Sequence, residues 1–175
     1  MRPSLLLTSF DTWLPHQKSN TSDDLLGRVI QFDSFPQSRS LLRKLPVDSQ
    51  LAAELTIDRL ETLQPNAVIC CGMAELRSTL TLESQAKRGD MALKSTLDVE
   101  RLVAQLAQTE VSHDAGGFVC NDLYYNVLDY IYQRQLRTHC LFVHIPLISE
   151  DNLPQLQADF LKLCQYVERY ASQSK

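Results

Sequence analysis

Short apolar runs alternate with longer amphipathic segments along this chain, and this alternation restricts its possible folds more than any other feature. Strand-like runs occupy residues 4–10, 41–47, 67–71, 76–82 and 140–146. Helical periodicity is found over residues 48–63, 97–106, 123–136 and 153–170. Because strands that alternate with helices usually form parallel sheets covered by helices, we predict an α/β sandwich with a mostly parallel sheet.

Local signals mark where some of these segments begin and end. Asp48 is the expected N-cap of the helix over residues 48–63. The run AVICC at residues 67–71 is typical of a strand buried on both faces, and we expect it to stop at Gly72. Residues 18–40 and 84–96 show little regular pattern, so we expect mobile loops there. The 175 residues contain no internal repeat or linker, which predicts a single domain spanning residues 1–175.

Composition excludes several functional classes. The net charge is −4 and there is no basic tract, so we expect no nucleic-acid partner. No apolar run reaches the roughly 18 residues of a membrane span, and the N-terminus lacks a signal-peptide core. The cysteines are odd in number, form no C-x-x-C pair, and are not spaced with histidines as in zinc sites. We therefore expect reduced thiols, no metal, no other cofactor, and a cytoplasmic location.

Cys120 is a candidate nucleophile. It follows the pair Gly116-Gly117, which permits a tight turn, and it precedes the helical pattern that begins at Leu123. A thiol within a residue or two of a helix N-terminus experiences a partial positive charge that lowers its pKa. Backbone N–H groups of the same turn can hold a developing oxyanion. The alternative interpretation is a buried structural cysteine.

His144 and Glu83 are candidate partners of that thiol. Alternation along residues 140–146 places Cys140, Phe142 and His144 on one face of a strand, with His144 near its carboxyl end, where ligands bind in α/β sheets. Glu83 ends the run TLTL and can orient a histidine base. The alternatives are a core histidine and a solvated surface glutamate.

The segment AGGFVCN at residues 115–121, with the helix that follows it, and the segment FVHIP at residues 142–146 resemble the pyroglutamyl peptidase I family of cysteine peptidases. Members of that family remove an N-terminal pyroglutamyl (5-oxoprolyl) residue from peptides. LPV at residues 45–47, QPNAVI at residues 64–69 and GMA followed by Arg77 also resemble family motifs. Glu83 falls where the family has its catalytic glutamate.

The resemblance implies a function and a site. Cys120 is the implied nucleophile, His144 the base and Glu83 the residue that orients it, with no metal. The implied fold is a three-layer α/β/α sandwich with a twisted mixed sheet. The implied partners are a small peptide with a blocked N-terminus and further copies of the chain, as a dimer or tetramer.

The substrate pocket is expected to be mostly apolar. Phe10, Trp13 and Phe142 are the candidates for its walls; the alternative is that they are plain core aromatics. The segments TSFDTW at residues 8–13 and ESQAKR at residues 83–88 depart from the family pattern. Two other functions therefore stay open: a homologue that binds a peptide or metabolite without turnover, and a related small-substrate amidase using the same three residues.

Overall fold

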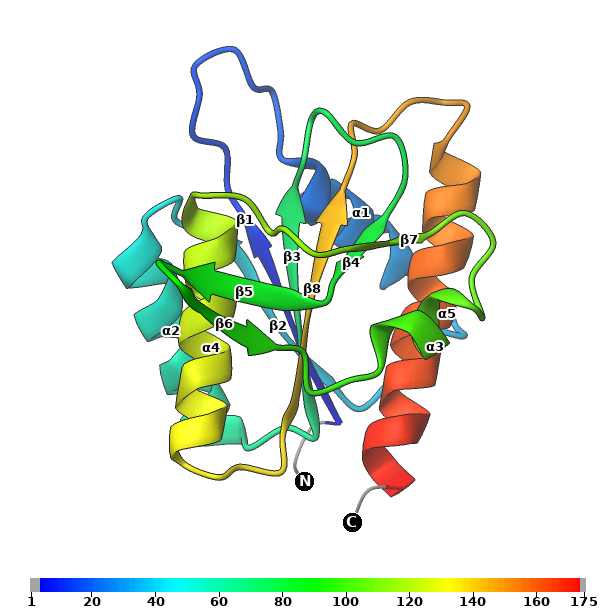
Figure 1. Ribbon diagram of the computed structural model, residues 1–175. Helices are drawn as coiled ribbons and strands as arrows, with labels where there is room; N and C mark the ends of the chain where they lie inside the picture. The colour runs from blue at the N-terminus through cyan, green and yellow to red at the C-terminus, as the bar shows by residue number, and fades with distance from the viewer. Residues whose placement is uncertain (1–3, 174–175) are drawn as a thin grey trace.

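The computed structural model describes residues 4–173 and contains a six-stranded mixed sheet flanked by helices (Figure 1). The strand order is β2-β1-β3-β8-β4-β7. The strands of this sheet are β1 (Leu5–Phe10), β2 (Arg39–Leu45), β3 (Ala67–Met73), β4 (Thr81–Glu83), β7 (Glu110–Ser112) and β8 (His139–Ile145). The helices are α1 (Thr21–Val29), α2 (Ser49–Leu63), α3 (Val99–Val103), α4 (Val119–Gln133) and α5 (Leu153–Gln173). The predicted α/β class is confirmed.

The sheet is parallel except at one pair of strands. β3 lies between β1 and β8 and pairs in parallel with both. β4 runs antiparallel to β8, so that Thr81 is opposite His144 and Glu83 is opposite Phe142. The start of β4 therefore lies beside the last residues of β8, and Glu83 at its end lies opposite Phe142, three residues before the end of β8.

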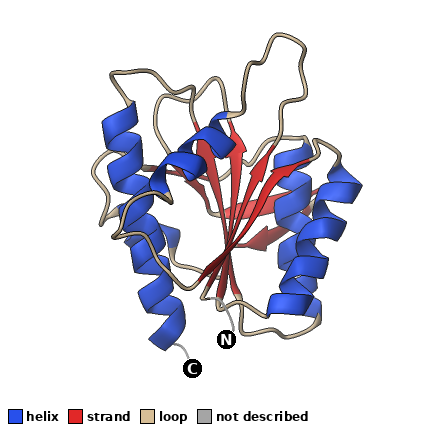
Figure 2. Ribbon diagram, turned by 180° about the vertical axis from the view of Figure 1, so that it is seen from behind, coloured by secondary structure: helices blue, strands red, loops and turns tan. Residues whose placement is uncertain are grey.

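Helices cover both faces of the sheet, and two apolar cores lie between the layers (Figures 1 and 2). α2 and α4 pack on one face, whereas α1, α3 and α5 pack on the other. Cys140 and Phe142 lie on one face of β8, as the alternation predicted, and both belong to the core under α2 and α4. Leu141, Val143 and Ile145 belong to the other core.

Several helix boundaries follow from capping and from tertiary contacts. Asp48 caps α2 as predicted, because its side chain accepts a hydrogen bond from the Leu51 N–H at 2.8 Å. α3 is shorter than the predicted helix over residues 97–106. The chain after α3 is held instead by the buried Asp159, whose carboxylate accepts hydrogen bonds from the backbone N–H groups of Ala107 and Gln108.

The segment 18–40 is not the loop that we expected, because it contains α1. Asn20 caps this helix through a hydrogen bond from the Ser22 N–H at 3.0 Å. Asp23 and Asp24 lie in its first turn, where a helix favours negative charge. The apolar face of α1 is buried against the sheet. Its buried apolar residues are Leu25, Leu26 and Val29.

The segment 84–96 is also more regular than expected. It forms a hairpin of β5 (Gln85–Arg88) and β6 (Met91–Lys94), closed by the two-residue turn Gly89-Asp90. Gly89 has a φ of 58°, a left-handed conformation that favours glycine. The hairpin is fastened to α4, since the Asn121 side chain binds both backbone groups of Lys87 at 2.8 and 2.7 Å. The expectation of an irregular loop is therefore wrong.

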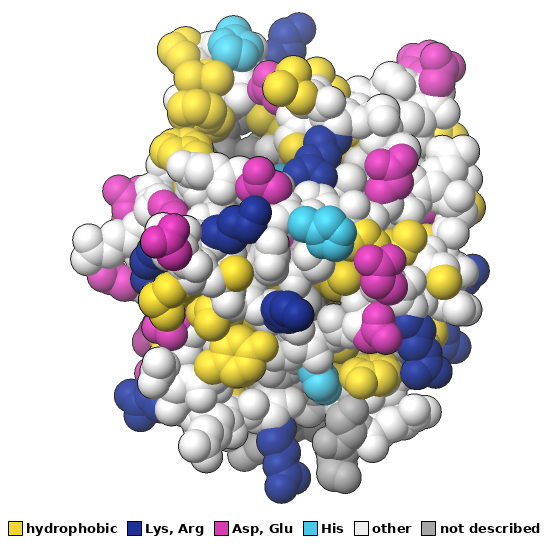
Figure 3. Space-filling model, in the orientation of Figure 1, with side chains coloured by type: hydrophobic (Ala, Val, Ile, Leu, Met, Phe, Trp, Pro, Cys, Tyr) yellow, Lys and Arg dark blue, Asp and Glu magenta, His cyan; other side chains and the backbone are white. Residues whose placement is uncertain are grey.

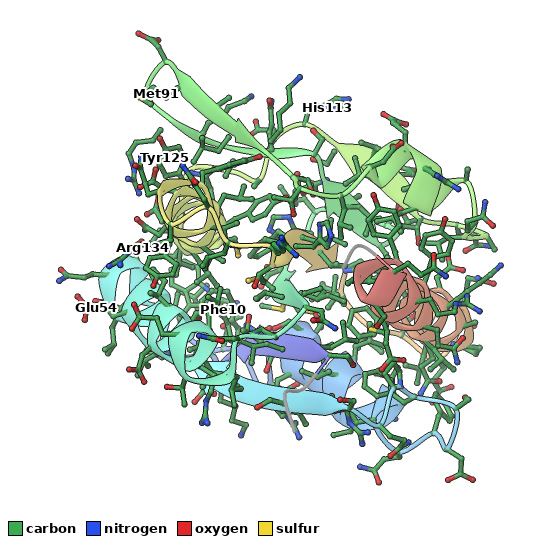
Figure 4. All side chains as sticks on the ribbon, turned by 90° about the horizontal axis from the view of Figure 1, so that it is seen from below. Phe10, Glu54, Met91, His113, Tyr125 and Arg134 are labelled. Carbon is green, nitrogen blue, oxygen red and sulfur yellow. The ribbon has the colours of Figure 1, made fainter. Side chains whose placement is uncertain are left out.

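Figure 4 shows the hairpin extending past α4, with Tyr125 beneath it and Met91 at its far end. The Arg88 guanidinium lies 4.0 Å from the centroid of the Tyr125 ring, a cation–π contact. The hairpin therefore packs on the helix that carries Cys120.

Three strand predictions need correction. β3 does not stop at Gly72 but continues to Met73. The strand predicted over residues 76–82 is limited to β4, because a turn in which the Arg77 N–H bonds the Ala74 carbonyl precedes it. β2 begins and ends two residues before the predicted range 41–47, since Pro46 has no N–H to donate to a sheet.

Candidate active site

A cavity of about 190 Å³ lies at the carboxyl ends of β1, β3 and β8, on the side of the sheet where α4 begins. Cys120 and His144 both line it, together with Phe10, Trp13, Met73 and Phe118. Carboxyl ends of parallel strands are the usual place for ligand sites in α/β proteins. We call this cavity the catalytic pocket.

Cys120 is the second residue of α4, so the predicted position beside a helix N-terminus is confirmed. Its side chain lies directly over the backbone of Gly72 in β3. A Cβ atom at Gly72 would be 2.6 Å from the Cys120 Sγ, which is closer than two such atoms can approach. The close passage of the thiol over the sheet therefore requires glycine at this position.

The predicted lowering of the Cys120 pKa is wrong. Burial raises the pKa of this thiol to about 12, and the nearby Glu83 carboxylate and Cys70 act in the same direction. At neutral pH, Cys120 is therefore a protonated thiol, and a base has to remove its proton before it can act as a nucleophile.

The first turn of α4 has free N–H donors. Phe118 occupies the N-cap position, and its side chain cannot accept a hydrogen bond from the turn. Among residues 4–173, no acceptor is bonded to the N–H of Val119 or Cys120. Both residues line the catalytic pocket, so these donors are available to an anionic oxygen near the thiol.

His144 and Glu83 form a buried hydrogen-bonded pair. Nδ1 of His144 lies 2.7 Å from Oε1 of Glu83, and Glu83 is completely buried. Because a carboxylate only accepts hydrogen bonds, Nδ1 carries the proton of this contact. Nε2 is therefore the ring nitrogen that carries no proton and can accept one. The structure thus brings the three predicted catalytic residues to one end of the sheet.

Arg77 supplies a second contact to Glu83, which the sequence-based prediction of the site missed. Its Nη2 lies 3.1 Å from Oε1 of Glu83, and the guanidinium also bonds Thr81 Oγ1 and the Asp114 carbonyl, both at 2.9 Å. A buried carboxylate is costly unless it is paired with a charge. Arg77 therefore offsets the burial of Glu83, and the Asp114 contact holds the loop that leads to Cys120.

The predicted aromatic walls have different positions. Phe10 is buried and lines the catalytic pocket, on the side of the sheet where α2 and α4 lie (Figure 4). Trp13 is 52% exposed and lies at the mouth, with its ring 5.1 Å from that of Phe118. Phe142 does not line the pocket, which corrects the expectation. It is fully buried between His144 and Tyr124, with ring centroids 4.8 and 5.7 Å away.

Several other residues line the catalytic pocket without having been predicted to do so. Met73 ends β3 and Val47 lies just beyond β2, so their place at the carboxyl edge follows directly from the bounds of those strands. Phe118 belongs to the AGGFVCN motif, but nothing in that motif marks it separately as a pocket residue.

Other expectations concern cofactors and membranes. All five cysteines are free thiols. Within residues 4–173, no three His, Cys, Asp or Glu side chains are grouped so that they could hold a metal ion. None of the helices in the same range is long and apolar enough to cross a membrane.

Comparisons with known proteins agree on one family. A family model described as pyroglutamyl peptidase matches residues 83–167. The pyrrolidone-carboxylate peptidase of Vibrio vulnificus is 29% identical over 90% of this chain and 86% of its own length. That of Brachyspira hyodysenteriae is 30% identical over 67% of this chain and 74% of its own length.

Solved structures show the same fold. The crystal structure of pyroglutamyl peptidase I from Bacillus amyloliquefaciens matches with a TM-score of 0.82 and 22% identity, covering 98% of both chains. Pyrrolidone carboxyl peptidase from Thermococcus litoralis matches with a TM-score of 0.81 and 19% identity, covering 100% of this chain and 97% of its own.

Proposed function

Because this chain belongs to the pyroglutamyl peptidase family, we propose that it is a cysteine peptidase that removes an N-terminal pyroglutamyl residue from peptides. Cys120 is the nucleophile, His144 the general base and Glu83 the residue that orients the base and balances its charge. The single observation that carries this proposal is the 2.7 Å contact between Glu83 Oε1 and His144 Nδ1, in a histidine that shares a pocket with Cys120.

The first step is proton transfer from the thiol. Cys120 is protonated at neutral pH because burial raises its pKa. Nε2 of His144 accepts the thiol proton, and the imidazolium that forms is paired with the Glu83 carboxylate at Nδ1. The ion pair makes this transfer more favourable than simple ionisation of a buried thiol, since the new positive charge has its counter-charge already in place.

The thiolate then attacks the carbonyl carbon of the pyroglutamyl residue. The carbonyl oxygen becomes an oxyanion, which the free N–H groups of Val119 and Cys120 stabilise. His144 returns the proton to the leaving amine, and the C–N bond breaks. Water, deprotonated by His144, hydrolyses the thioester, and 5-oxoproline and the free thiol are released.

The walls of the catalytic pocket favour a neutral ring at the N-terminal position. Phe10, Trp13 and Val47 provide apolar surface. Among the described residues that line the pocket, none is Asp or Glu, so a free α-amino group would find no counter-charge there. A lactam has lost that charge and keeps an N–H and a carbonyl that backbone groups can bind.

This proposal is tested by offering the protein two peptides that differ only in their first residue. One begins with pyroglutamate and the other with proline, and both are incubated with the wild type and with His144→Ala. We expect mass spectrometry to detect 5-oxoproline only from the first peptide and only with the wild type. Equal cleavage of both peptides would contradict the assignment of the pocket to a lactam.

A second candidate function is binding without turnover, as in a catalytically altered homologue. The raised pKa of Cys120 favours it, because a thiol that keeps its proton is a poor nucleophile. Calorimetry with the pyroglutamyl peptide separates the two. Saturable binding by the wild type with the peptide recovered intact supports this second candidate.

A further inference from the structure

A second cavity, of about 440 Å³, adjoins the catalytic pocket at the carboxyl edge of the sheet. Met73 at the end of β3 lines both cavities, so they are neighbours across a single side chain. The second cavity lies towards α1 and is formed by residues 16–19, the exposed side of α1 and residues 147–148 after β8. We call it the distal cavity.

The distal cavity has cationic side chains without partners. Lys18 and Arg28 line it, neither is buried, and neither side chain is bonded to another group among residues 4–173. Two carboxylates, Asp24 and Glu75, also line the cavity, and each accepts a hydrogen bond from a neutral side chain. Asp24 accepts a hydrogen bond from Ser19 Oγ at 2.5 Å, and Glu75 accepts one from Gln17 Nε2 at 3.1 Å.

Figure 3 shows the top of the molecule, where the loop between β1 and α1 lies. A histidine and a basic side chain lie there beside a group of hydrophobic side chains. His16 is the histidine of the distal cavity, and it is exposed. The lining of the distal cavity combines the apolar side chains of Met73, Leu147 and Ile148 with the cationic side chains of Lys18 and Arg28.

The volumes of the two cavities indicate which part of a substrate each one can hold. The catalytic pocket, at about 190 Å³, is smaller than the roughly 300 Å³ at which pockets for drug-sized ligands begin. It has room for a lactam ring at Cys120 but not for the chain that follows the scissile bond. That chain has to leave the pocket past its rim, and Met73 is the part of the rim that opens onto a second cavity.

We propose that the distal cavity binds a carboxylate of the leaving peptide, so that the substrates are short pyroglutamyl peptides with a negative charge close behind the scissile bond. This inference rests on the proposed function, because it takes Cys120 as the point of cleavage. Lys18 and Arg28 attract the carboxylate, and Met73 and Leu147 contact the apolar part of the residue. These residues determine specificity and take no part in the bond-breaking steps.

The carboxylate has two sources, the C-terminus of a dipeptide and an acidic side chain after the pyroglutamyl residue. Four substrates distinguish them: pyroglutamyl-alanine, pyroglutamyl-alanine amide, pyroglutamyl-glutamate amide and pyroglutamyl-glutamine amide. Dissociation constants are measured by calorimetry on Cys120→Ser, and KM and kcat on the wild type, at low ionic strength. The same constants are then measured on versions of both proteins that also carry Lys18→Gln/Arg28→Gln. Cations outside both cavities provide the matched control, Arg59→Gln/Lys162→Gln.

We expect each substrate whose carboxylate reaches the distal cavity to bind about fivefold more tightly than the matched amide without that charge. In the kinetic measurements, this preference should change KM rather than kcat. The preference should fall below about twofold in Lys18→Gln/Arg28→Gln or in high salt, and persist in the control. Equal binding of all four substrates, or a preference that survives loss of both cations, would overturn the inference. Preference in binding with no turnover by the wild type would uphold it and refute the proposed peptidase activity instead.

Discussion

Glu83 and His144 are joined by a 2.7 Å hydrogen bond across two antiparallel strands, although they are not directly opposite each other. Glu83 is opposite Phe142, so its side chain lies on the same face of the sheet as the side chains of Phe142 and His144. It therefore reaches His144, the diagonal neighbour two residues further along β8. If β4 were parallel to β8, its backbone would run along β8 in the opposite direction. The single antiparallel pair in the sheet is thus what places an acidic residue behind the histidine.

Replacing Glu83 by glutamine should lower kcat by about 100-fold or more. Glutamine has nearly the same shape but no charge, so the imidazolium formed in the first step loses its counter-charge and Nδ1 loses its fixed proton. The measurement is steady-state hydrolysis of a pyroglutamyl substrate by Glu83→Gln. Glu110→Gln, an exposed residue at the start of β7, is the control. Activity within a few-fold of the wild type in Glu83→Gln would contradict the assigned role.

Arg77→Gln should reduce both stability and activity. It leaves the buried Glu83 carboxylate with His144 as its sole side-chain partner, a loss of about 1–3 kcal/mol for a charged group. We expect denaturant unfolding to show this loss and kcat to fall about tenfold, since Glu83 and the loop before Cys120 are less well held. Arg101→Gln on the exposed side of α3 should change neither quantity. An unchanged midpoint in Arg77→Gln would show that the ion pair does not contribute.

The uncapped start of α4 predicts a conflict between stability and activity. Phe118→Ser introduces a hydroxyl that can accept the Cys120 or Asn121 N–H, which stabilises a helix by about 1 kcal/mol relative to alanine. The same bond competes with an oxyanion for its donor. Compared with Phe118→Ala, which removes the ring without adding an acceptor, Phe118→Ser should therefore be more stable but slower in kcat. Higher kcat in Phe118→Ser than in Phe118→Ala would refute the use of these N–H groups.

Buried thiols predict a loss of stability at alkaline pH. Burial raises the pKa of Cys71, Cys120, Cys140 and Cys164 above the value of about 8.5 that thiols have in unfolded chains. Above that pH the unfolded chain releases protons that the folded protein retains. The contribution of these thiols to the free energy of unfolding should therefore be constant below about pH 8 and decrease above it.

Denaturant unfolding measured from pH 7 to pH 10.5 checks this expectation. Each thiol contributes a slope of up to about 1.4 kcal/mol per pH unit above about pH 9. Cys164→Ala, in a part of the core far along the chain from Cys120, should show a shallower slope than the wild type whatever its absolute stability. Identical slopes in the two proteins would contradict the linkage.

Patterning located β1, β2, β3 and β8, and capping located the start of α2. The alternation along β8 alone assigns Phe142 and His144 to one face, and the Asp48 cap fixes the start of α2. These features are local, because side-chain period and N-cap chemistry act within a few residues. The same holds for Cys120, whose place at a helix start follows from the glycines before it.

Features that depend on tertiary contacts could not be predicted in this way. β4 has only three residues, so neither its length nor its direction is visible in the sequence, and Glu83 was assigned through a family resemblance. The hairpin over residues 84–96 has weak strand propensity, and the signal that was missed is the two-residue turn Gly89-Asp90. The raised pKa of Cys120 results from burial by residues distant in the chain, which a local sequence pattern does not reveal.

The central claim, that Cys120 is a nucleophile served by His144, is tested most directly by hydrolysis of pyroglutamyl-aminomethylcoumarin. Wild type, Cys120→Ser and Cys164→Ala are compared at the same concentration, after circular dichroism has shown that all three are folded. The account predicts fluorophore release by the wild type and Cys164→Ala, and none above background by Cys120→Ser. Equal release by Cys120→Ser, or no release by the wild type together with no alkylation of Cys120 by iodoacetamide, would contradict it.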